Sequence, residues 1–347
     1  MAPSRLSAIL SRFPHTAIAV VGDFFLDKYL EIDQALAEVS LETGLEVRQV
    51  VKVRCQPGAA GTVVSNLCAL GVGRVVCIGF VGDDGEGFEL VRGLRSMGAE
   101  TNDVMVRQDR FTPTYCKPLM RESDGRLREL ERLDTKNRQP LPPDLEQALI
   151  GALRAVVPEV QAVIALDQVQ EAECGVITRA MRQALDEVAC TFPDRLFFGD
   201  SRTRVGEYRN VMVKANREEV CGAIHPGSAA HRSDGIGVCA GALSQRVGRP
   251  VFVTLGSEGV MYGTHDAAQI IPAVPVTGGV DIVGAGDAAT AALASALSAG
   301  ATPTEAAVIA NIAASLTIQQ IGTTGTATQE QVRERFEQYA DVWRDLK

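Results

Sequence analysis

The chain has 347 residues, of which 46% are hydrophobic, 22% are charged and 5% are aromatic. This composition describes a globular chain long enough for one large domain or two ordinary ones. The chain has 34 lysines and arginines and 43 acidic residues, and the resulting net charge of −9 repels nucleic-acid backbones. Few aromatic rings are available to stack on bases. We therefore expect no nucleic-acid partner. The 33 glycines, roughly a tenth of the chain against about 7% on average, are the unusual feature.

The cysteines and the N-terminal sequence indicate a compartment. Eight cysteines are scattered without a C-x-x-C pair or the spacing of a zinc site, which is typical of reduced thiols. The opening MAPSRLSAILSRFPH lacks the apolar region, at least about seven residues long, of a secretory signal. No run of about 20 uncharged apolar residues follows. We expect a cytoplasmic protein with no membrane association.

Short β-branched runs alternate with Ala- and Leu-rich stretches of helical period through most of the chain. In chain order, strands are predicted at residues 17–21, 74–78, 162–165, 196–199, 211–214 and 251–255, and helices at 62–70, 87–96, 145–156, 175–188, 218–223, 233–247, 287–299 and 304–317. This alternation predicts one α/β domain over residues 1–347. We expect a doubly wound, mostly parallel sheet with helices on both faces.

Two stretches with period-two polarity interrupt the alternation. Residues 46–53 form one of them, and the other is a pair of runs at 114–120 and 127–133, joined by the turn signal Ser-Asp-Gly-Arg at 123–126. We predict a small antiparallel β flap, or lid, inserted at approximately 28–56 and 110–134. Because short antiparallel strands leave edges to be covered, this flap is also a candidate surface for a homodimer.

The strongest local signal is the heptapeptide DIVGAGD at residues 281–287, which leads directly into an Ala-rich helix. Its two glycines let the backbone approach a ligand closely, and free N–H groups at the start of a helix form a site for phosphate. Asp287 is then placed to accept a proton from an attacking hydroxyl, while the N–H groups of residues 284–286 stabilise a phosphoryl group in transit. The plainer interpretation is that Asp287 only caps the helix, which contributes about 0.5–2 kcal/mol without any function.

Further Gly- and Asp-rich turns follow predicted strands, where open α/β sheets bind ligands. The first is Gly22-Asp23, with Asp27 shortly after it. Later ones are PGAAG at residues 57–61, GDDGEG at 82–87, KANREE at 214–219 and TLGSEG at 254–259. Taken singly, Asn216 with Glu219 is also consistent with a helix cap followed by a first-turn acid. The glycines of the turn at 254–259 are also consistent with an ordinary turn that binds no ligand.

In that order and at those separations the chain resembles the PfkB (ribokinase-like) carbohydrate kinase family, from about residue 16 to residue 330. It is most similar to the heptose-phosphate kinase branch, whose opening VVGD-x-x-LD-[KR]-Y reads VVGDFFLDKY here, at residues 20–29. The pattern ALSAG…TPTEAA…IGTTGT after the late helix also matches. The resemblance implies a ribokinase-like fold and ATP-dependent phosphorylation of a hydroxyl on a sugar or sugar phosphate, including a heptose phosphate. It also implies Mg²⁺, and a monovalent cation such as K⁺ as an additional candidate.

The resemblance also implies roles for individual residues. For catalysis these are Asp287 as the base and Gly284, Ala285 and Gly286 as the anion hole. For the nucleotide they are Gly256, Gly259, Asn216 and Asn311, the last of them near the adenine. Asn216 and Glu219 would organise Mg²⁺. For the acceptor they are Asp27, with Asp23 nearby, and the positions of Gly58 and Thr62.

The half of the motif set that contacts sugar departs from the family pattern. Gly58-Ala59 and Thr62 stand where the family usually has two adjacent glycines and, a few residues on, an Asn that touches substrate. QVQ at residues 168–170 replaces a Tyr and a Lys of the heptose-kinase branch, and residues 39–45 lack its prolines. A phosphorylated acceptor would need a cationic clamp, for which Arg202 with Arg204, or Lys117 or Arg121 on the flap, are candidates.

Two other classes of function compete with a kinase. A catalytically degenerate member of the same fold, which binds sugar or nucleotide as a sensor, is motivated by Thr62 and the altered segment at 167–170. The intact Asp287, Asn216 and Glu219 argue against it. A dinucleotide dehydrogenase is disfavoured because Gly22-Asp23, and no G-x-G-x-x-G, follows the first strand.

Overall fold

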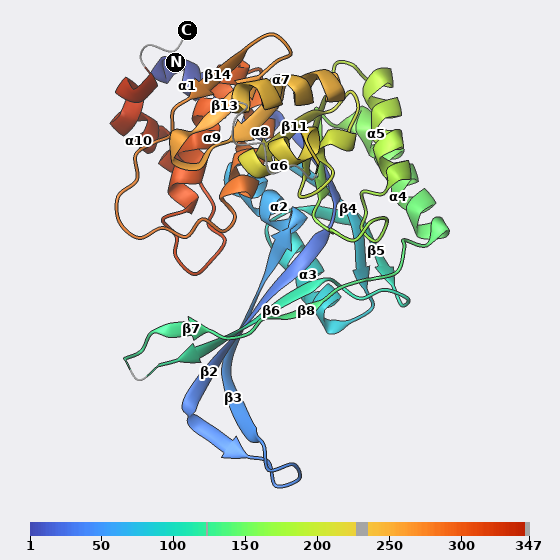
Figure 1. The fold of residues 1–347 in the computed structure, drawn as a ribbon, viewed down its shortest axis with the longest axis vertical. Coiled ribbons are helices and arrows are strands. Elements are labelled where there is room, and N and C mark those ends of the chain that lie inside the picture. The colour runs from blue at the N-terminus through green and yellow to red at the C-terminus, as the bar shows by residue number, and fades with distance from the viewer. Residues whose placement is uncertain (123, 227–234, 344–347) are drawn as a thin grey trace.

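A computed structural model describes residues 1–122, 124–226 and 235–343 (Figure 1). Ser123 of the predicted turn and the predicted helix start at Ser233 lie outside the described residues. The main sheet has the strand order β14-β13-β12-β11-β10-β9-β1-β4-β5, and it is parallel from β12 to β5 and antiparallel at β13 and β14. Its strands are β1 (Ala17–Gly22), β4 (Arg74–Gly82), β5 (Glu100–Arg107), β9 (Ala162–Asp167), β10 (Leu196–Ser201), β11 (Met212–Asn216), β12 (Val251–Thr254), β13 (Val260–Gly263) and β14 (Ala268–Ile271). The predicted doubly wound, mostly parallel sheet is confirmed.

Two hydrophobic cores lie on opposite faces of this sheet, because strand side chains alternate between faces. In β1, Ile18 and Val20 join one core, and Ala19 and Val21 join the other. The first core contains α1 (Pro3–Leu10), α2 (Ala60–Ala69), α3 (Gly85–Ser96), α8 (Ala285–Ser298), α9 (Pro303–Thr317) and α10 (Gln329–Tyr339). The second contains α4 (Pro143–Val156), α5 (Arg179–Thr191), α6 (Arg217–Ile224) and α7 (Ile236–Val247). Short 3₁₀ turns lie at Phe13–His15, Val157–Glu159, Val205–Glu207, Gly256–Glu258 and Ala340–Trp343.

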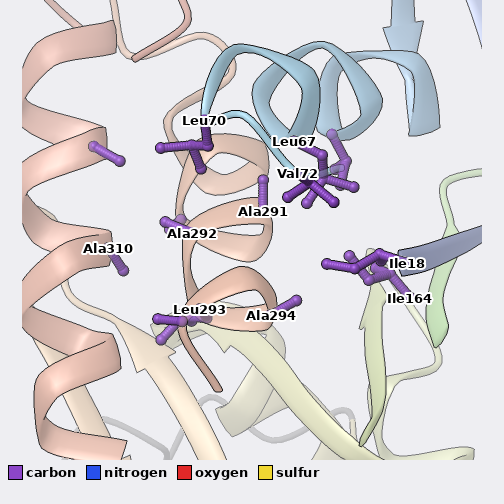
Figure 2. Packing of buried hydrophobic residues seen from close by; sticks show 14 of the residues in the cluster. Ile18, Leu67, Leu70, Val72, Ile164, Ala291, Ala292, Leu293, Ala294 and Ala310 are labelled. Atoms are coloured by element: carbon purple, nitrogen blue, oxygen red, sulfur yellow. The ribbon is translucent and has the colours of Figure 1, made fainter. Parts of the chain in front are cut away.

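Helix α8 is buried on nearly every side, and its small side chains explain how. It packs against both α9 and α2. Ala292 and Leu293 point toward α9, whereas Ala291 and Ala294 point away from it, toward α2 and the sheet (Figure 2). All four are fully buried. Alanine both favours helix and lets neighbours approach closely. The Ala-rich sequence therefore fixes the position of the N terminus of α8.

A second sheet, which contains both antiparallel and parallel strand pairs, projects from the main body (Figure 1). It comprises β2 (Phe24–Val39), β3 (Glu46–Ala59), β6 (Thr114–Arg121), β7 (Leu127–Glu129) and β8 (Leu133–Thr135). The predicted flap is thus present, with β2 following β1 almost without interruption. The single strand expected at 127–133 is wrong, because β7 and β8 are two short strands that pair with opposite ends of β6. The ends of β2 and β3 farthest from the body expose apolar side chains at Leu36, Val39, Val47, Val50, Val51 and Val53.

The C-terminal segment folds back onto the main sheet. Trp343 is buried, and its ring stacks on Phe336 of α10 with 5.9 Å between centroids. Its indole N–H donates to the carbonyl of Pro272 at 2.8 Å. The segment that follows β14 is therefore tied to the end of the described chain.

None of the helices in the described part of the chain combines the length and the apolar character that crossing a membrane requires.

Candidate active site

The sequence-predicted ligand residues lie along one edge of the main sheet. Asp23 follows β1, Gln168 follows β9, Arg202 follows β10, Asn216 ends β11 and Gly256 comes shortly after β12. These strands are consecutive neighbours in the parallel part of the sheet, so their carboxyl ends form one continuous edge. Ligands of open α/β sheets bind at this edge. Two cavities lie there, one at the β12 end and one at the β1 end.

The N terminus of α8 has the geometry of an anion site. Gly284 caps the helix with φ of +82°, a conformation that glycine adopts without strain. In the described residues, no carbonyl or side chain accepts from the N–H of Gly284 or Gly286, as expected at the start of a helix. The N–H of Ala285 instead donates to the carbonyl of Ile282 at 3.2 Å. Of the three predicted anion-hole residues, two therefore offer free amides.

The larger cavity, of about 670 Å³, extends from this helix start between β12–β13 and α9. Its lining includes the predicted residues Gly256, Gly259, Asn311, Ala285 and Gly286, and otherwise it is mainly apolar. A mainly apolar lining with a few polar groups is typical of a small-molecule site. The side-chain amide of Asn311 donates to the carbonyls of Ile271 and Pro272, at 2.9 and 3.1 Å. Asn311 therefore also holds the cavity wall in place.

Asp287 lies in the first turn of α8, and its environment disfavours the ionised form. Burial raises the pKa of this carboxyl to about 7, and the negative charges of Asp200 and Asp27 add to the increase. Lys214 and Arg202 oppose it. A carboxyl that titrates near neutral pH is suited to take a proton from a hydroxyl.

Lys214 and Asp200 form a buried ion pair beside Asp287 that the sequence analysis did not single out. The Nζ–Oδ2 distance is 2.6 Å, and both side chains are buried. Burial lowers the pKa of Lys214, but the charges of Asp200, Glu219 and Asp287 outweigh it and raise the pKa overall. The signal available in the sequence was a lysine inside the otherwise apolar strand VMVKA, because buried lysines are rare unless paired.

Asn216 and Glu219 form a capping box at the start of α6. The Oδ1 of Asn216 accepts from the N–H of Glu219 at 2.9 Å, and the carboxylate of Glu219 accepts from the N–H of Asn216 at 2.7 Å. The helix cap that the plainer interpretation expects is therefore present. One carboxylate oxygen of Glu219 stays outside the capping box. Burial, followed by the charge of Asp200, raises the pKa of Glu219.

Asp27 is buried in β2 and forms an ion pair with Lys117 of β6, with 3.0 Å between Nζ and Oδ1. A Cβ at Gly58 would lie 2.6 Å from the Oδ2 of Asp27, so the carboxylate needs glycine at that position. Thr62 is buried in α2, and its methyl group lies 3.6 Å from the place of a Cβ at Gly284. Asp27, Gly58 and Thr62 therefore come together with the N terminus of α8, as the resemblance implies.

Asp23 has a structural task. Its carboxylate accepts from the N–H groups of Gln168 and Val169, at 2.8 and 3.0 Å, and of Val176, at 2.7 Å. Burial and the charge of Asp167 raise its pKa to about 6, although these three hydrogen bonds lower it. Asp23 thus ties the segment after β9 to the end of β1, while it also lines the smaller cavity.

The smaller cavity, of about 190 Å³, lies between the sheet edge and the flap. Three cations line it. Arg132 pairs with Asp134 and lies over the ring of Tyr115, and Lys136 pairs with Glu171.

The third cation of the smaller cavity, Arg202, forms no ion pair among the described residues; its Nε donates to the Oε1 of Gln168 at 2.8 Å. The other clamp candidates are occupied, because Lys117 pairs with Asp27, Arg121 with Glu31 and Arg204 with Asp167.

The anion site at the start of α8 and the perturbed carboxyl of Asp287 beside it lie at the carboxyl edge of a parallel sheet, an arrangement that suits phosphoryl transfer. The description "pfkB family carbohydrate kinase" matches residues 26–330. The chain belongs to this family, and it is a carbohydrate kinase.

A curated relative is similar to this chain along most of its length. It is "Bifunctional protein HldE" of Desulfatibacillum aliphaticivorans, which is 26% identical over 331 residues and covers 94% of this chain. The chain spans 64% of the length of that relative.

Solved structures share the fold. A ribokinase of Arabidopsis thaliana, complexed with ribose and ATP, is 18% identical with a TM-score of 0.65, and the match covers 93% of this chain and 99% of that one. Phosphofructokinase-2 of Escherichia coli, in complex with fructose-6-phosphate, is 15% identical with a TM-score of 0.68, covering 94% and 99%.

Proposed function

We propose that the protein transfers the γ-phosphoryl group of ATP to a hydroxyl of a phosphorylated sugar. The observation that carries this proposal is the position of Asp287, whose carboxyl lies at the anion site of α8. In the proposed reaction Asp287 accepts the proton of the acceptor hydroxyl. The free amides of Gly284 and Gly286 donate to the oxygens of the phosphoryl group, where its charge is greatest.

The larger cavity is the proposed nucleotide site. Its apolar lining suits a base and ribose, and it ends at Ala285 and Gly286, where the phosphates would reach the helix N terminus. Gly256 and Gly259 both have positive φ and line the same cavity, so the backbone comes close to the ligand there.

The residues around Asp287 fit a bound Mg²⁺. Three carboxylates, of Asp200, Glu219 and Asp287, stand against two cations, Lys214 and Arg202, so negative charge is in excess when all three carboxylates are ionised. Among the described residues, no three His, Cys, Asp or Glu side chains are close enough together to hold a metal. Mg²⁺ commonly binds through one or two carboxylates, waters and substrate phosphates, and Glu219 with Asn216 would hold it in this way. When bound, it would neutralise charge on the phosphates.

The proposed acceptor site combines the smaller cavity with the neighbourhood of Asp27, Gly58 and Thr62, which do not line that cavity but lie at the N terminus of α8. Arg202 supports a phosphorylated acceptor. Its guanidinium lines the cavity without an acidic partner in the described part of the chain. A planar guanidinium binds a phosphate through paired hydrogen bonds. A heptose phosphate is the acceptor that the resemblance of residues 20–29 to the heptose-phosphate kinase branch implies.

An acceptor panel tests the substrate. We expect ADP release with MgATP and one or more sugar phosphates, heptose phosphates first among them, and slow or no release with the corresponding free sugars. Arg202→Met should raise the KM for the phosphorylated acceptor at least about tenfold, with little change in the KM for ATP. A free sugar that is turned over equally well by the wild type and by Arg202→Met would contradict this assignment.

Replacement of the proposed base tests the mechanism. Asp287→Asn should bind MgATP normally and lower kcat by at least about two orders of magnitude, the usual contribution of a general base. If turnover survives largely intact, Asp287 is not the base.

A sensor without turnover is the second candidate, and it is motivated by Thr62 and by the altered segment at residues 167–170. A thermal shift with sugar or nucleotide, but no ADP from any acceptor, would support the sensor over the kinase.

A further inference from the structure

Lys214 is a buried lysine in an apolar strand. It stands in β11 between Val213 and Ala215, which belong to the core on one face of the sheet. Because side chains alternate along a strand, Lys214 points to the other face. Its neighbour in register on β12, Phe252, belongs to the core that contains α8. The ammonium group therefore lies under the helix that carries Asp287.

Contacts fix where the ammonium lies. Asp200 is the register partner of Lys214 on β10, and its Oδ2 lies 2.6 Å from Nζ. The same Oδ2 accepts from the hydroxyl of Thr290 in α8 at 3.0 Å. Nζ lies 3.5 Å from the carbonyl oxygen of Gly286, and a Cβ at Gly286 would lie only 3.1 Å from it. The glycine at 286 thus leaves room for the lysine to reach the first turn of α8.

The ammonium has more donors than close acceptors. It carries three N–H groups, and in the described residues only Asp200 accepts at short distance. A buried charged group is stable only when its hydrogen bonds are met. An oxygen of an anionic ligand at the N terminus of α8 would meet one of them. Asp200, which accepts a hydrogen bond from Thr290, would keep the ammonium in place while the ligand is bound.

We propose that Lys214 is a catalytic residue that donates a hydrogen bond to the phosphoryl group in transit. The inference rests on the proposed function, in which the ATP phosphates lie at the start of α8. In the step, the acceptor oxygen forms a bond to the γ-phosphorus and its proton goes to Asp287. The bond from the γ-phosphorus to the bridging oxygen breaks, and ADP leaves with the electron pair. Lys214 places a compact positive charge beside the three equatorial oxygens, where negative charge is greatest.

The alternative is a purely structural role, in which Lys214 only joins β10, β11 and α8. The two roles predict different effects on the affinities for ATP and ADP. A contact to the γ-phosphoryl group strengthens binding of ATP but not of ADP, whereas a structural role affects both equally or neither.

The experiment compares two nucleotides on three proteins. Binding of MgADP and of the magnesium complex of the non-hydrolysable analogue adenylyl imidodiphosphate is measured by calorimetry on the wild type, Lys214→Met and Arg204→Met. Arg204 is the matched control, because it is another partly buried cation, paired with Asp167 (Nε–Oδ2 3.0 Å), and it lines neither cavity. We expect Lys214→Met to weaken the analogue at least about tenfold more than ADP, and to lower kcat by about two orders of magnitude or more. Arg204→Met should leave the ratio of the two affinities unchanged.

A paired variant guards against loss of folding. Lys214→Met leaves Asp200 buried without its partner, which is costly, whereas Asp200→Asn with Lys214→Met removes both charges and is expected to be better tolerated. The paired variant should melt closer to the wild type and still lack the preference for the analogue. An unchanged affinity ratio in either folded variant, with kcat within about threefold of the wild type, would overturn the proposal. Failure of the wild type to bind either nucleotide would instead refute the proposed function.

Discussion

At the scale of single residues, the ionisation of Asp287 should control the rate. Burial and the charges of Asp200 and Asp27 raise its pKa to about 7, against the opposing charges of Lys214 and Arg202. Only the ionised carboxylate accepts a proton. We expect kcat/KM for the acceptor, which reports the free enzyme, to fall about tenfold per pH unit below about pH 7 and to level off above it. A profile that stays flat down to about pH 5.5 would contradict this assignment.

The same pKa predicts how stability depends on pH. The folded pKa of Asp287 lies above its ordinary value of 3.8, so the fold favours the protonated form. The resulting stabilisation is complete below about pH 4 and is lost as the pH rises through about 7. Asp287→Asn removes this loss. Its melting temperature relative to the wild type should therefore be higher at pH 8 than at pH 5, which differential scanning fluorimetry measures. An equal difference at both values would show that the carboxyl is not perturbed.

Gly58 is predicted to act through Asp27. A Cβ in Gly58→Ala would lie 2.6 Å from the Oδ2 of Asp27, which must move and weaken its ion pair with Lys117. We expect the KM for the acceptor to rise about tenfold or more, with the KM for ATP nearly unchanged. Gly151→Ala in α4 is the control, because nothing lies within 4 Å of the added methyl group. Equal acceptor kinetics in the two variants would separate Gly58 from the acceptor site.

Sequence alone identified candidate residues that the structure brings to one edge of the sheet, but not their partners. Asp287 and the glycines around it were predictable, because a backbone turn into a helix is a local property. Lys214 was missed, because its role depends on Asp200, which lies in a different strand and meets it only through the register of β10 and β11. The capping box of Asn216 and Glu219 was considered and is present.

At the scale of elements, the predicted alternation of strands and helices was correct where periodicity is strong. The six predicted strands of the main sheet and the eight predicted helices are all present, apart from the start at Ser233, outside the described residues. Helices α1 and α10 were not predicted, because they are short and polar and become stable by packing on the first core. The length of β2 was also missed, since only its pairing with β3 and β6 stabilises it.

The flap is the element for which we predict a partner, a second copy of this chain. Val51 and Val53 of β3 are both exposed, and they leave apolar surface that a partner could cover. We expect the wild type to sediment as a dimer and Val51→Lys to shift it toward monomer. Val106→Lys on β5, an even more exposed valine on the main sheet, is the control and should not change the mass. A wild type that is monomeric at all concentrations would rule this out.

At the scale of the whole molecule, the acidic balance and the binding of anions are compatible because the positive groups are local. The net charge is −9, yet the N terminus of α8, Lys214 and Arg202 gather along one sheet edge. The parallel strands bring these groups together from distant parts of the chain. The net charge therefore argues against nucleic-acid partners but does not describe the charge at the site.

Trp343 is the only tryptophan of the chain, so its emission has a single source. Its indole N–H is bonded to the carbonyl of Pro272, and the next residue, Ala273, lines the larger cavity. Occupation of that cavity should change the polarity around the indole. We expect MgATP to alter the intrinsic fluorescence in a saturable way, while sugar phosphate alone leaves it unchanged and Trp343→Phe abolishes the signal. Constant emission at nucleotide concentrations that calorimetry shows to be saturating would contradict this. The hydrogen bond that ties Trp343 to the segment after β14 would thus make the protein its own optical probe, able to follow nucleotide binding without any label.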